Sequence, residues 1–420
     1  MVRTKSRWRI LPKMAVIGLL ALAACSPDSS EAAEAPQTSV DTTAPTTITT
    51  SSTSQVDTTE QAASSTTETS TTEAQPGDDT AVVVMTGGIT DEFLDVVRTT
   101  PEVDRTAVLQ TGQLRLTGSA DQTGQAVDQL DEGFVIPIDS RAYESPEEAD
   151  WSAPALAATL QALEPDELVL SESSAALRRL DTGATMTFND SATFRVGAVL
   201  ADEVVGAVEA VFVGPEAFAL AGGGSGRRVA LVDYQGTGEE LERILLQANG
   251  GEGVRVFGGR GGEDLSDRDR AVLAQIRVKE IFGEFAFRPG SGGTVQIDPD
   301  WVEANIVTVD FPLLGATRCH RVFSEIVEEV MQGLVDDGLE DVIDSSAFQG
   351  CWNPRFISGS DRLSRHAWGI AVDINFFNPL DGGPGSPVNS ELLDRFEAAG
   401  VTSGHDWTFP DPGHFEYLTG

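Results

Sequence analysis

The chain has 420 residues, which is enough for two or three domains and a sizeable hydrophobic core. Its formal net charge is -38, from 66 acidic and 28 basic residues, so electrostatic attraction to nucleic acid or to an anionic lipid surface is excluded. We expect most of this charge to form a solvated surface. Four histidines occur in the whole chain, and two of them lie in paired motifs near its C-terminus.

The first 25 residues have the features of a bacterial lipoprotein signal. Arginines and lysines precede a short apolar run from Met14 to Leu22, and Leu22-Ala23-Ala24-Cys25 matches a lipobox. The run is too short for a comfortable transmembrane helix. We expect residues 1–25 to be a signal peptide and Cys25 to be lipidated, which would anchor the chain outside the cytoplasmic membrane. The alternative is an ordinary cleaved signal with an incidental cysteine.

The other two cysteines, Cys319 and Cys351, form an even pair in a chain with export features. Exported proteins meet an oxidising environment, so we expect a disulfide between them. The alternative is two free, buried thiols.

Residues 26–80 have the composition of a tether. They are rich in Ser, Thr, Ala, Glu, Asp, Pro and Gln and contain no aromatic residue, no Lys and no Arg. Such a segment cannot bury enough apolar surface to fold. As a disordered coil of about 55 residues it would span roughly 40 Å, which suits a linker between a membrane anchor and a folded head.

Residues 81–262 are expected to form a mixed α/β extracytoplasmic domain of unknown role. Thr90 is expected to cap a short helix that presents Phe93, Leu94 and Val97 on one face, and a second helix is expected at 174–180. The strand-like segments are 81–85, 107–109, 114–116, 167–170, 185–188, 194–200 and 208–213.

Part of this region resembles a transporter module. Residues 165–173 and 180–185 resemble the extracytoplasmic module of MacB/FtsX-type permeases, which implies binding or coupling without chemistry of its own. Two glycine clusters, at 222–226 and 258–262, lack the Gly-Lys-Ser/Thr continuation of a phosphate-binding loop. We therefore expect turns there, and no nucleotide site.

After a connector at 263–298, residues 299–420 are expected to form the C-terminal domain. A helix over 267–282, capped by Ser266, leads into it. A strand is expected at 306–309 and helices at 320–336 and 390–399, each ending near a glycine.

The segment from Ser364 to Asp373 reads as one half of a metal site. His366 and Asp373 are seven residues apart, and both ligands would have to come within about 2.0–2.2 Å of one zinc ion. Seven residues advance about 10.5 Å along a helix and about 23 Å along a strand, so neither regular element brings the two side chains together. The chain must therefore reverse, and Gly369 is the natural place because glycine tolerates a left-handed backbone.

The other half follows near the C-terminus, as Asp411-Pro412-Gly413-His414-Phe415-Glu416. Together with Ser364-x-His366-x-x-Gly369-x-Ala371-x-Asp373, it makes residues 299–420 resemble a superfamily of zinc peptidases, the VanY-like D-alanyl-D-alanine carboxypeptidases and L-alanyl-D-glutamate endopeptidases. The resemblance implies an α+β fold. We expect a C-terminal zinc peptidase domain with a small antiparallel sheet and flanking helices, preceded by a separate mixed α/β domain.

The resemblance also implies the roles of the site residues. His366, Asp373 and His414 would bind Zn²⁺, and three protein ligands with an open fourth position are typical of catalytic zinc. Asp411 would act as general base. Glu416 shares a strand face with His414 and would orient that ring.

The residues around these motifs have less certain roles. Arg355 is a candidate for stabilising negative charge on the carbonyl oxygen or for binding a substrate carboxylate, and a structural ion pair is the alternative. Ser364 contacts substrate or stabilises a turn, and Trp407 and Trp368 line the cleft or pack in the core. We expect His320 and His405 to be non-ligands.

The sequence thus predicts a lipid-anchored zinc peptidase of the cell envelope. Its expected substrates are peptidoglycan stem peptides, cut as a D-Ala-D-Ala carboxypeptidase or as an L-Ala-D-Glu endopeptidase. The competing class is a non-catalytic binding or regulatory lipoprotein that keeps zinc for structure. Asp411 favours catalysis, because a purely structural zinc needs no base beside a ligand. A protein substrate outside the cell wall also remains open, and the oligomeric state is unknown.

Overall fold

The computed structural model describes residues 80–418, apart from 86, 152, 207, 226, 252, 259–273, 359, 377–389, 406 and 408–410. The predicted signal peptide, Cys25 and the tether before Thr80 lie outside the described residues. So do Ser266, the start of the helix expected at 267, and most of the second glycine cluster.

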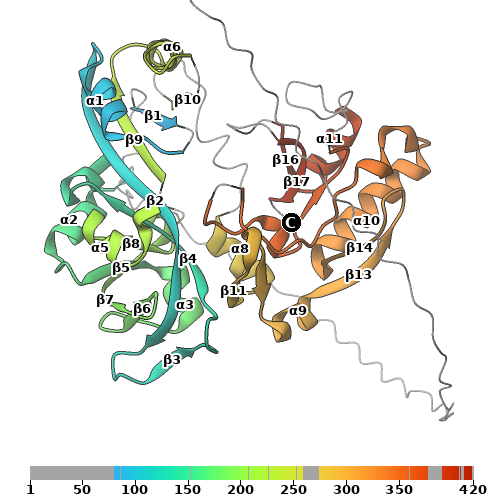
Figure 1. Ribbon diagram of the computed structural model, residues 1–420, viewed down its shortest axis with the longest axis horizontal. Helices are drawn as coiled ribbons and strands as arrows, with labels where there is room; N and C mark the ends of the chain where they lie inside the picture. Colours follow the sequence, from blue (N-terminus) through green and yellow to red (C-terminus); the bar gives the residue numbers. More distant parts are fainter. Residues whose placement is uncertain are drawn as a thin grey trace, which may run out of the picture. The chain divides into compact units, whose positions relative to one another are not determined.

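A mixed sheet dominates the first half of the described chain (Figure 1). It has ten strands, in the order β10-β1-β9-β2-β4-β8-β5-β7-β6, with β3 paired to β2 off this path. Two pairs, β4 with β8 and β5 with β7, are parallel. The strands are β1 (Thr80–Met85), β2 (Val103–Ala120), β3 (Ala126–Gln129), β4 (Ile136–Tyr143), β5 (Glu167–Ser171), β6 (Thr185–Phe188), β7 (Ala192–Leu200), β8 (Ala210–Phe212), β9 (Arg227–Tyr234) and β10 (Val254–Gly258).

Strand β2 explains the size of this sheet. It runs unbroken for 18 residues, visible as the long strand in Figure 1. Along its length it pairs with β9, β4, β3 and β6. The predicted strands at 107–109 and 114–116 are confirmed as strand, but their division into two is wrong because both belong to β2.

Six helices and two 3-10 turns accompany the strands of the sheet region among the described residues, and three clusters of buried apolar side chains form its core. Thr90 caps the first helix by accepting a hydrogen bond from the Phe93 amide at 3.2 Å, and Phe93, Leu94 and Val97 are buried, which confirms the predicted cap and face. The helices are α1 (Asp91–Thr99), α2 (Pro154–Ala162), α3 (Glu172–Arg178), α4 (Asp202–Val205), α5 (Pro215–Leu220) and α6 (Gly238–Ala248), with 3-10 turns η1 (Pro146–Trp151) and η2 (Gly223–Ser225).

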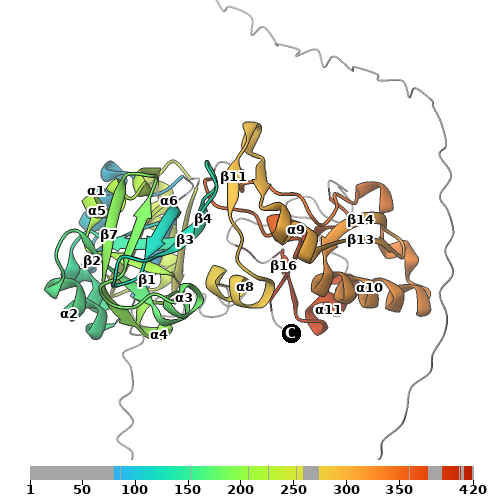
Figure 2. The same cartoon turned by 90° about the horizontal axis from the view of Figure 1, so that it is seen from below.

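The C-terminal half is built from helices and small antiparallel sheets. Figure 2 shows α10 packed along the β13–β14 hairpin. The elements are α8 (Gln275–Phe282), β11 (Phe287–Pro289), η3 (Ser291–Gly293), β12 (Val295–Ile297), α9 (Pro299–Asn305), β13 (Ile306–Phe311), β14 (Gly315–His320), α10 (Arg321–Asp336), η4 (Glu340–Val342), η5 (Ser345–Ala347), η6 (Arg365–Ala367), β15 (Ala371–Asp373), α11 (Ser390–Ala398), β16 (Val401–Gly404) and β17 (Asp411–Tyr417).

One hydrophobic core holds this half together. It extends from Val278 on α8 to Tyr417 on β17 and includes the buried face of α10. A disulfide joins Cys319 to Cys351, with 5.2 Å between the Cα atoms, and confirms the predicted pairing. The predicted helices at 320–336 and 390–399 are present as α10 and α11. The helix expected over 267–282 is not continuous, because Ala274 has a non-helical ψ of 141° and α8 begins at Gln275.

The expected fold class needs correction. The sequence predicted an α+β fold with a small antiparallel sheet in a C-terminal peptidase domain and a separate mixed α/β domain before it, but the largest element is the ten-stranded mixed sheet. The three-stranded sheet β15-β17-β16 is minor beside it. The error arose because β2 was divided and because β4, β9 and β10 were not recognised, so nothing indicated that the strands join into one large sheet. The expected domain boundaries stay predictions.

A buried ion cluster links α8 to the mixed sheet. The Lys279 ammonium lies 2.8 Å from both carboxylate oxygens of Glu209 and 2.8 Å from Glu284. Arg178 on α3 pairs with the same two carboxylates. The cluster therefore contains two cations and two anions, and its charges balance.

Within the described residues, no helix is both long enough and apolar enough to cross a membrane.

Candidate metal centre

A tight turn places His366. The Ser364 hydroxyl caps the turn η6 by accepting a hydrogen bond from the His366 amide at 3.3 Å. Gly369 then adopts a φ of +68°, and a Cβ there would lie 2.8 Å from the His320 amide nitrogen. This confirms the predicted reversal at Gly369, because both the backbone conformation and the lack of space require glycine.

Two neighbouring strands supply the other candidate ligands. Asp373 on β15 and His414 on β17 are directly paired across the sheet. The β16–β17 register is irregular between Gly404 and Ser403, which pair with Asp411 and Phe415 respectively. Across this irregularity Asp411 lies in the same strand as His414.

His366, Asp373 and His414 converge. One donor atom from each lies within 4.8 Å of the others, and all three side chains are buried. The Asp373 Oδ1 atom is 3.1 Å from His366 Nε2 and 2.9 Å from His414 Nδ1. Two ligand atoms bound to one tetrahedral zinc at the usual bond lengths would be about 3.3 Å apart, so this spacing fits a shared zinc ion.

The outer contacts of the two rings determine which nitrogen faces inward. His366 Nδ1 lies 2.8 Å from the Cys351 carbonyl oxygen, which can only accept a hydrogen bond. His414 Nε2 lies 3.1 Å from Glu416 Oε2, also an acceptor. In a neutral ring the proton is therefore on the outer nitrogen, and the inner nitrogen presents its lone pair. Two such lone pairs and a carboxylate meet at one point, a donor set that suits a metal cation.

The pKa shifts agree with a preference for positive charge at this point. Burial alone would raise the pKa of Asp373, but hydrogen bonds with His366 and His414 hold it below its usual range. Burial alone would lower the pKa of His414, but hydrogen bonds with Asp373 and Glu416 raise it to about 10. A bound cation would satisfy the same carboxylates that otherwise hold a proton on His414.

Asp411 lies close enough to interact with these groups. Burial raises the pKa of its carboxyl, Asp373 adds to the rise, and His414 opposes it. A carboxylate with a raised pKa is a better proton acceptor at neutral pH. The positive charge of Arg355 lowers the pKa of Asp411 slightly against this rise. Among the described residues Arg355 forms no ion pair within 4.0 Å, so the structural ion pair that was its alternative role is not seen there.

The other expected site residues lie in different surroundings. The Trp407 ring centroid is 5.1 Å from that of His414, so this tryptophan lines the cluster. Trp368 is fully buried and packs against Phe285, with 4.6 Å between ring centroids, so it belongs to the core. His320 caps α10 through its ring nitrogen, which accepts from the Val322 amide at 3.2 Å.

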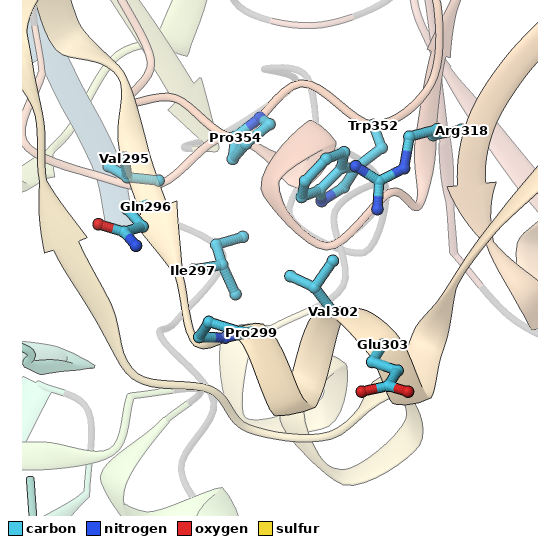
Figure 3. Close-up of a pocket in the computed structure, with 9 residues that line it drawn as sticks. All are labelled: Val295, Gln296, Ile297, Pro299, Val302, Glu303, Arg318, Trp352 and Pro354. Atoms are coloured by element: carbon cyan, nitrogen blue, oxygen red, sulfur yellow. The ribbon is translucent and has the colours of Figure 1, made fainter.

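A pocket of about 580 Å³ adjoins residues 351–354, the segment whose Cys351 carbonyl contacts the His366 ring (Figure 3). Its wall includes Trp352 and Pro354, and the guanidinium of Arg318 lies 4.1 Å above the Trp352 ring. The opposite wall comes from β12 and α9. In the same segment as Trp352, the Asn353 amide donates to the His366 carbonyl at 3.0 Å. Residues 352 and 354 thus line the pocket, and the intervening residues 351 and 353 hold His366.

A family model described as D-alanyl-D-alanine carboxypeptidase matches residues 358–417. This stretch contains His366, Asp373, Asp411 and His414, and it shows a similarity to this peptidase family over a short part of the chain. No curated protein sequence matches the chain.

Three solved structures are similar to part of the chain at low scores. The periplasmic region of MacB from Actinobacillus actinomycetemcomitans has 12% identity and a TM-score of 0.29, over 44% of this chain and 91% of that chain. The extracellular domain of the noncanonic ABC-type transporter YknZ from Gram-positive bacteria has 12% identity and a TM-score of 0.28, over 43% and 100%. A permease domain from Porphyromonas gingivalis has 14% identity and a TM-score of 0.25, over 43% and 87%. Similarities at this level support no conclusion about activity.

Sequence reasoning missed the Cys351 carbonyl as the partner of His366. Backbone carbonyls are the same in every residue, so no side-chain pattern could have indicated it. The nearby cysteine was noticed only for its disulfide.

Proposed function

We propose that the chain is a zinc-dependent metallopeptidase that hydrolyses peptidoglycan stem peptides. The observation that carries this proposal is the convergence of His366, Asp373 and His414 near the half-buried carboxyl group of Asp411. The family match over residues 358–417 supports it, because that stretch contains all four side chains.

His366, Asp373 and His414 would hold the zinc ion. When bound, zinc supplies a Lewis acid that polarises a peptide carbonyl and makes a water molecule acidic at neutral pH. The Cys351 carbonyl and Glu416 fix the two imidazole rings so that the inner nitrogens stay directed at the ion. No movement of these rings is needed, which keeps the reorganisation cost of catalysis low.

Two further side chains act on the substrate in this proposal. Asp411 accepts the proton of the attacking water on a carboxylate oxygen, a role worth typically about 10²–10⁴ in rate. Arg355 binds the negative charge that develops on the carbonyl oxygen, or the carboxylate of the substrate. Its guanidinium suits either task, because its N–H groups form paired, charge-assisted hydrogen bonds.

The substrate assignment rests on the description of the matching family. D-Ala-D-Ala carboxypeptidase activity is the first choice, and L-Ala-D-Glu endopeptidase activity is the second. The pocket beside Trp352 supplies an apolar wall and the Arg318 guanidinium, where the flanking part of a peptide would lie. The lipobox and the tether support a lipid-anchored location outside the cytoplasmic membrane, where peptidoglycan is found.

The alternative is a non-catalytic binding or regulatory lipoprotein with a structural zinc ion. The large mixed sheet favours this alternative, because none of its strands contributes to the cluster. Asp411 argues against it, because a structural zinc site has no use for a base with a raised pKa.

Digestion of isolated peptidoglycan tests the proposal. The purified mature chain, loaded with zinc, is incubated with peptidoglycan, and the muropeptides are identified by mass spectrometry. Loss of a terminal D-Ala indicates a carboxypeptidase, and a cut between L-Ala and D-Glu indicates an endopeptidase. His366→Ala is expected to abolish both activity and zinc binding. Unchanged muropeptides from a chain that carries one zinc ion would overturn the cell-wall proposal.

A further inference from the structure

A short hairpin connects two parts of the proposed active site. Arg355 stands at its start and Ser364, which caps the turn carrying His366, stands at its end. The hairpin is closed by a bridge between Phe356 and Leu363 and by a hydrogen bond from the Ser364 amide to the Arg355 carbonyl at 3.0 Å. Any force that holds one strand of this hairpin therefore also positions Arg355.

The mixed sheet holds this hairpin at two adjacent points. Gln113 on β2 accepts a hydrogen bond from the Leu363 amide at 3.0 Å. Asp139 on β4 accepts one from the guanidinium of Arg362 at 2.7 Å. Gln113 and Asp139 are direct cross-strand partners, and both are 5% exposed. Consecutive hairpin residues thus contact a matched pair of buried side chains from the sheet.

The contacts of Gln113 orient its amide group. Its nitrogen donates to Asp139 at 3.0 Å and to the side chain of Gln275, which leaves its oxygen for Leu363. A fully satisfied buried network of this kind is rigid, and loss of one member leaves polar groups without partners. The network therefore fixes the position of Leu363 relative to the sheet.

We propose that Gln113 and Asp139 are positioning residues for the peptidase site. They hold the 355–364 hairpin, so that the Arg355 guanidinium stays at the distance from the metal cluster that catalysis requires. Neither residue touches the substrate, and both act through Arg355. This inference rests on the proposed peptidase function. It also gives the large sheet a role, because two of its central strands support the active site.

A double-mutant cycle in the full mature chain tests the inference. Gln113→Met keeps the size of the side chain and removes its hydrogen bonds, and it is expected to lower kcat/KM on muropeptides by about 10- to 100-fold. In an Arg355→Met background the same change is expected to cause little further loss, because the group it positions is absent. Equal losses in both backgrounds would overturn the proposal.

Two further measurements and a control variant separate positioning from other effects. Zinc content is expected to stay at one ion per chain, because the ligands are held by Cys351 and Glu416 instead. Exchange of the Leu363 amide hydrogen is expected to accelerate in Gln113→Met. Gln122→Met, at an exposed position in the turn that follows β2, is the matched control and is expected to change neither quantity.

A second variant covers the case in which Gln113→Met does not fold, and the outcomes distinguish failure of the proposed function from failure of the positioning role. Where Gln113→Met does not fold, Arg362→Met replaces it, because the Arg362 side chain is 43% exposed and its loss is expected to be tolerated. A smaller loss of kcat/KM, again absent in the Arg355→Met background, is expected. An inactive wild-type chain that binds zinc overturns the proposed function itself, whereas an active wild type with fully active Gln113→Met and Arg362→Met overturns only the positioning role.

Discussion

Two buried polar clusters in this protein look alike in burial and differ in charge. In the ion cluster, Lys279 and Arg178 face Glu209 and Glu284, so every charge has an opposite partner. In the cluster of His366, Asp373 and His414, each inner atom is an acceptor or a lone-pair donor. The first cluster is complete as it stands, and the second has the donor set to hold a cation.

This difference separates a structural cluster from a binding site. Buried charges cost several kcal/mol each unless they are paired, so a self-neutral cluster is compatible with a purely structural role. A group of electron-pair donors converging on one point is unfavourable unless a proton or a metal ion lies between them. An unbalanced set of electron-pair donors, more than burial, therefore marks the candidate functional site.

The largest expected effect is loss of metal and activity in Asp373→Asn. The substitution keeps the shape of the side chain and removes the only negative charge among the three ligands. Zinc content, measured by mass spectrometry of the metal after dialysis, is expected to fall from one ion per chain to none, and peptidase activity to fall below detection. Asp300→Asn makes the same chemical change at an exposed position and is expected to alter neither. Full zinc content in Asp373→Asn would contradict the distinction between the two clusters.

Asp411→Asn is expected to separate chemistry from metal binding. Removal of the proposed base should lower kcat by about 10²–10⁴, because the amide cannot accept the proton. Zinc content is expected to stay at one ion per chain, since Asp411 is not among the converging ligands. Steady-state kinetics and metal analysis on the same sample provide the check. Loss of zinc together with activity would instead make Asp411 a ligand.

Glu209→Gln is expected to reduce stability and leave the metal site intact. It leaves two buried cations, Lys279 and Arg178, with one carboxylate between them, a loss of about 3–5 kcal/mol in the free energy of unfolding. Urea unfolding measures this loss, and the folded fraction is expected to keep one zinc ion. The double variant Glu209→Leu with Lys279→Met removes the uncompensated charge and is expected to recover part of the stability. A loss below about 1 kcal/mol in Glu209→Gln would show that the ion cluster does not support the fold.

The first half of the metal cluster was accessible from the sequence because its information is local, whereas His414, 41 residues beyond Asp373, was linked to it by the family resemblance. The spacing of His366 and Asp373 demands a reversal, and Gly369 stands where that reversal can occur. The covered face of α10 was equally visible, since its apolar residues recur at three and four. Local patterns of this kind depend on chemistry within about ten residues, so the turn and the helix face that they predict are found in the folded chain.

The mixed sheet was not accessible in the same way. Gln110 to Gln113 looks like a polar break between two strands, yet Gln113 is buried because Asp139 and Gln275 satisfy its amide. The partners of Gln113 lie 26 and 162 residues away, so no local pattern announces them. Positioning residues are hidden from sequence reasoning for this reason, because their role depends on a distant partner.

The smallest expected effect concerns His320, which belongs to neither cluster. Burial beside Phe282 lowers the pKa of its imidazole to about 4, so the unfolded chain, with an ordinary value near 6.5, binds the proton more tightly. Stability is therefore complete above pH 6.5 and is lost as the pH falls toward 4, by up to about 3 kcal/mol. Urea unfolding at several pH values measures this loss. His320→Asn keeps a side-chain acceptor at the start of α10 and cannot titrate, so its stability is expected to change less over this range. An identical pH dependence in the wild type and in His320→Asn would contradict this assignment and show that other titratable groups cause the acid sensitivity.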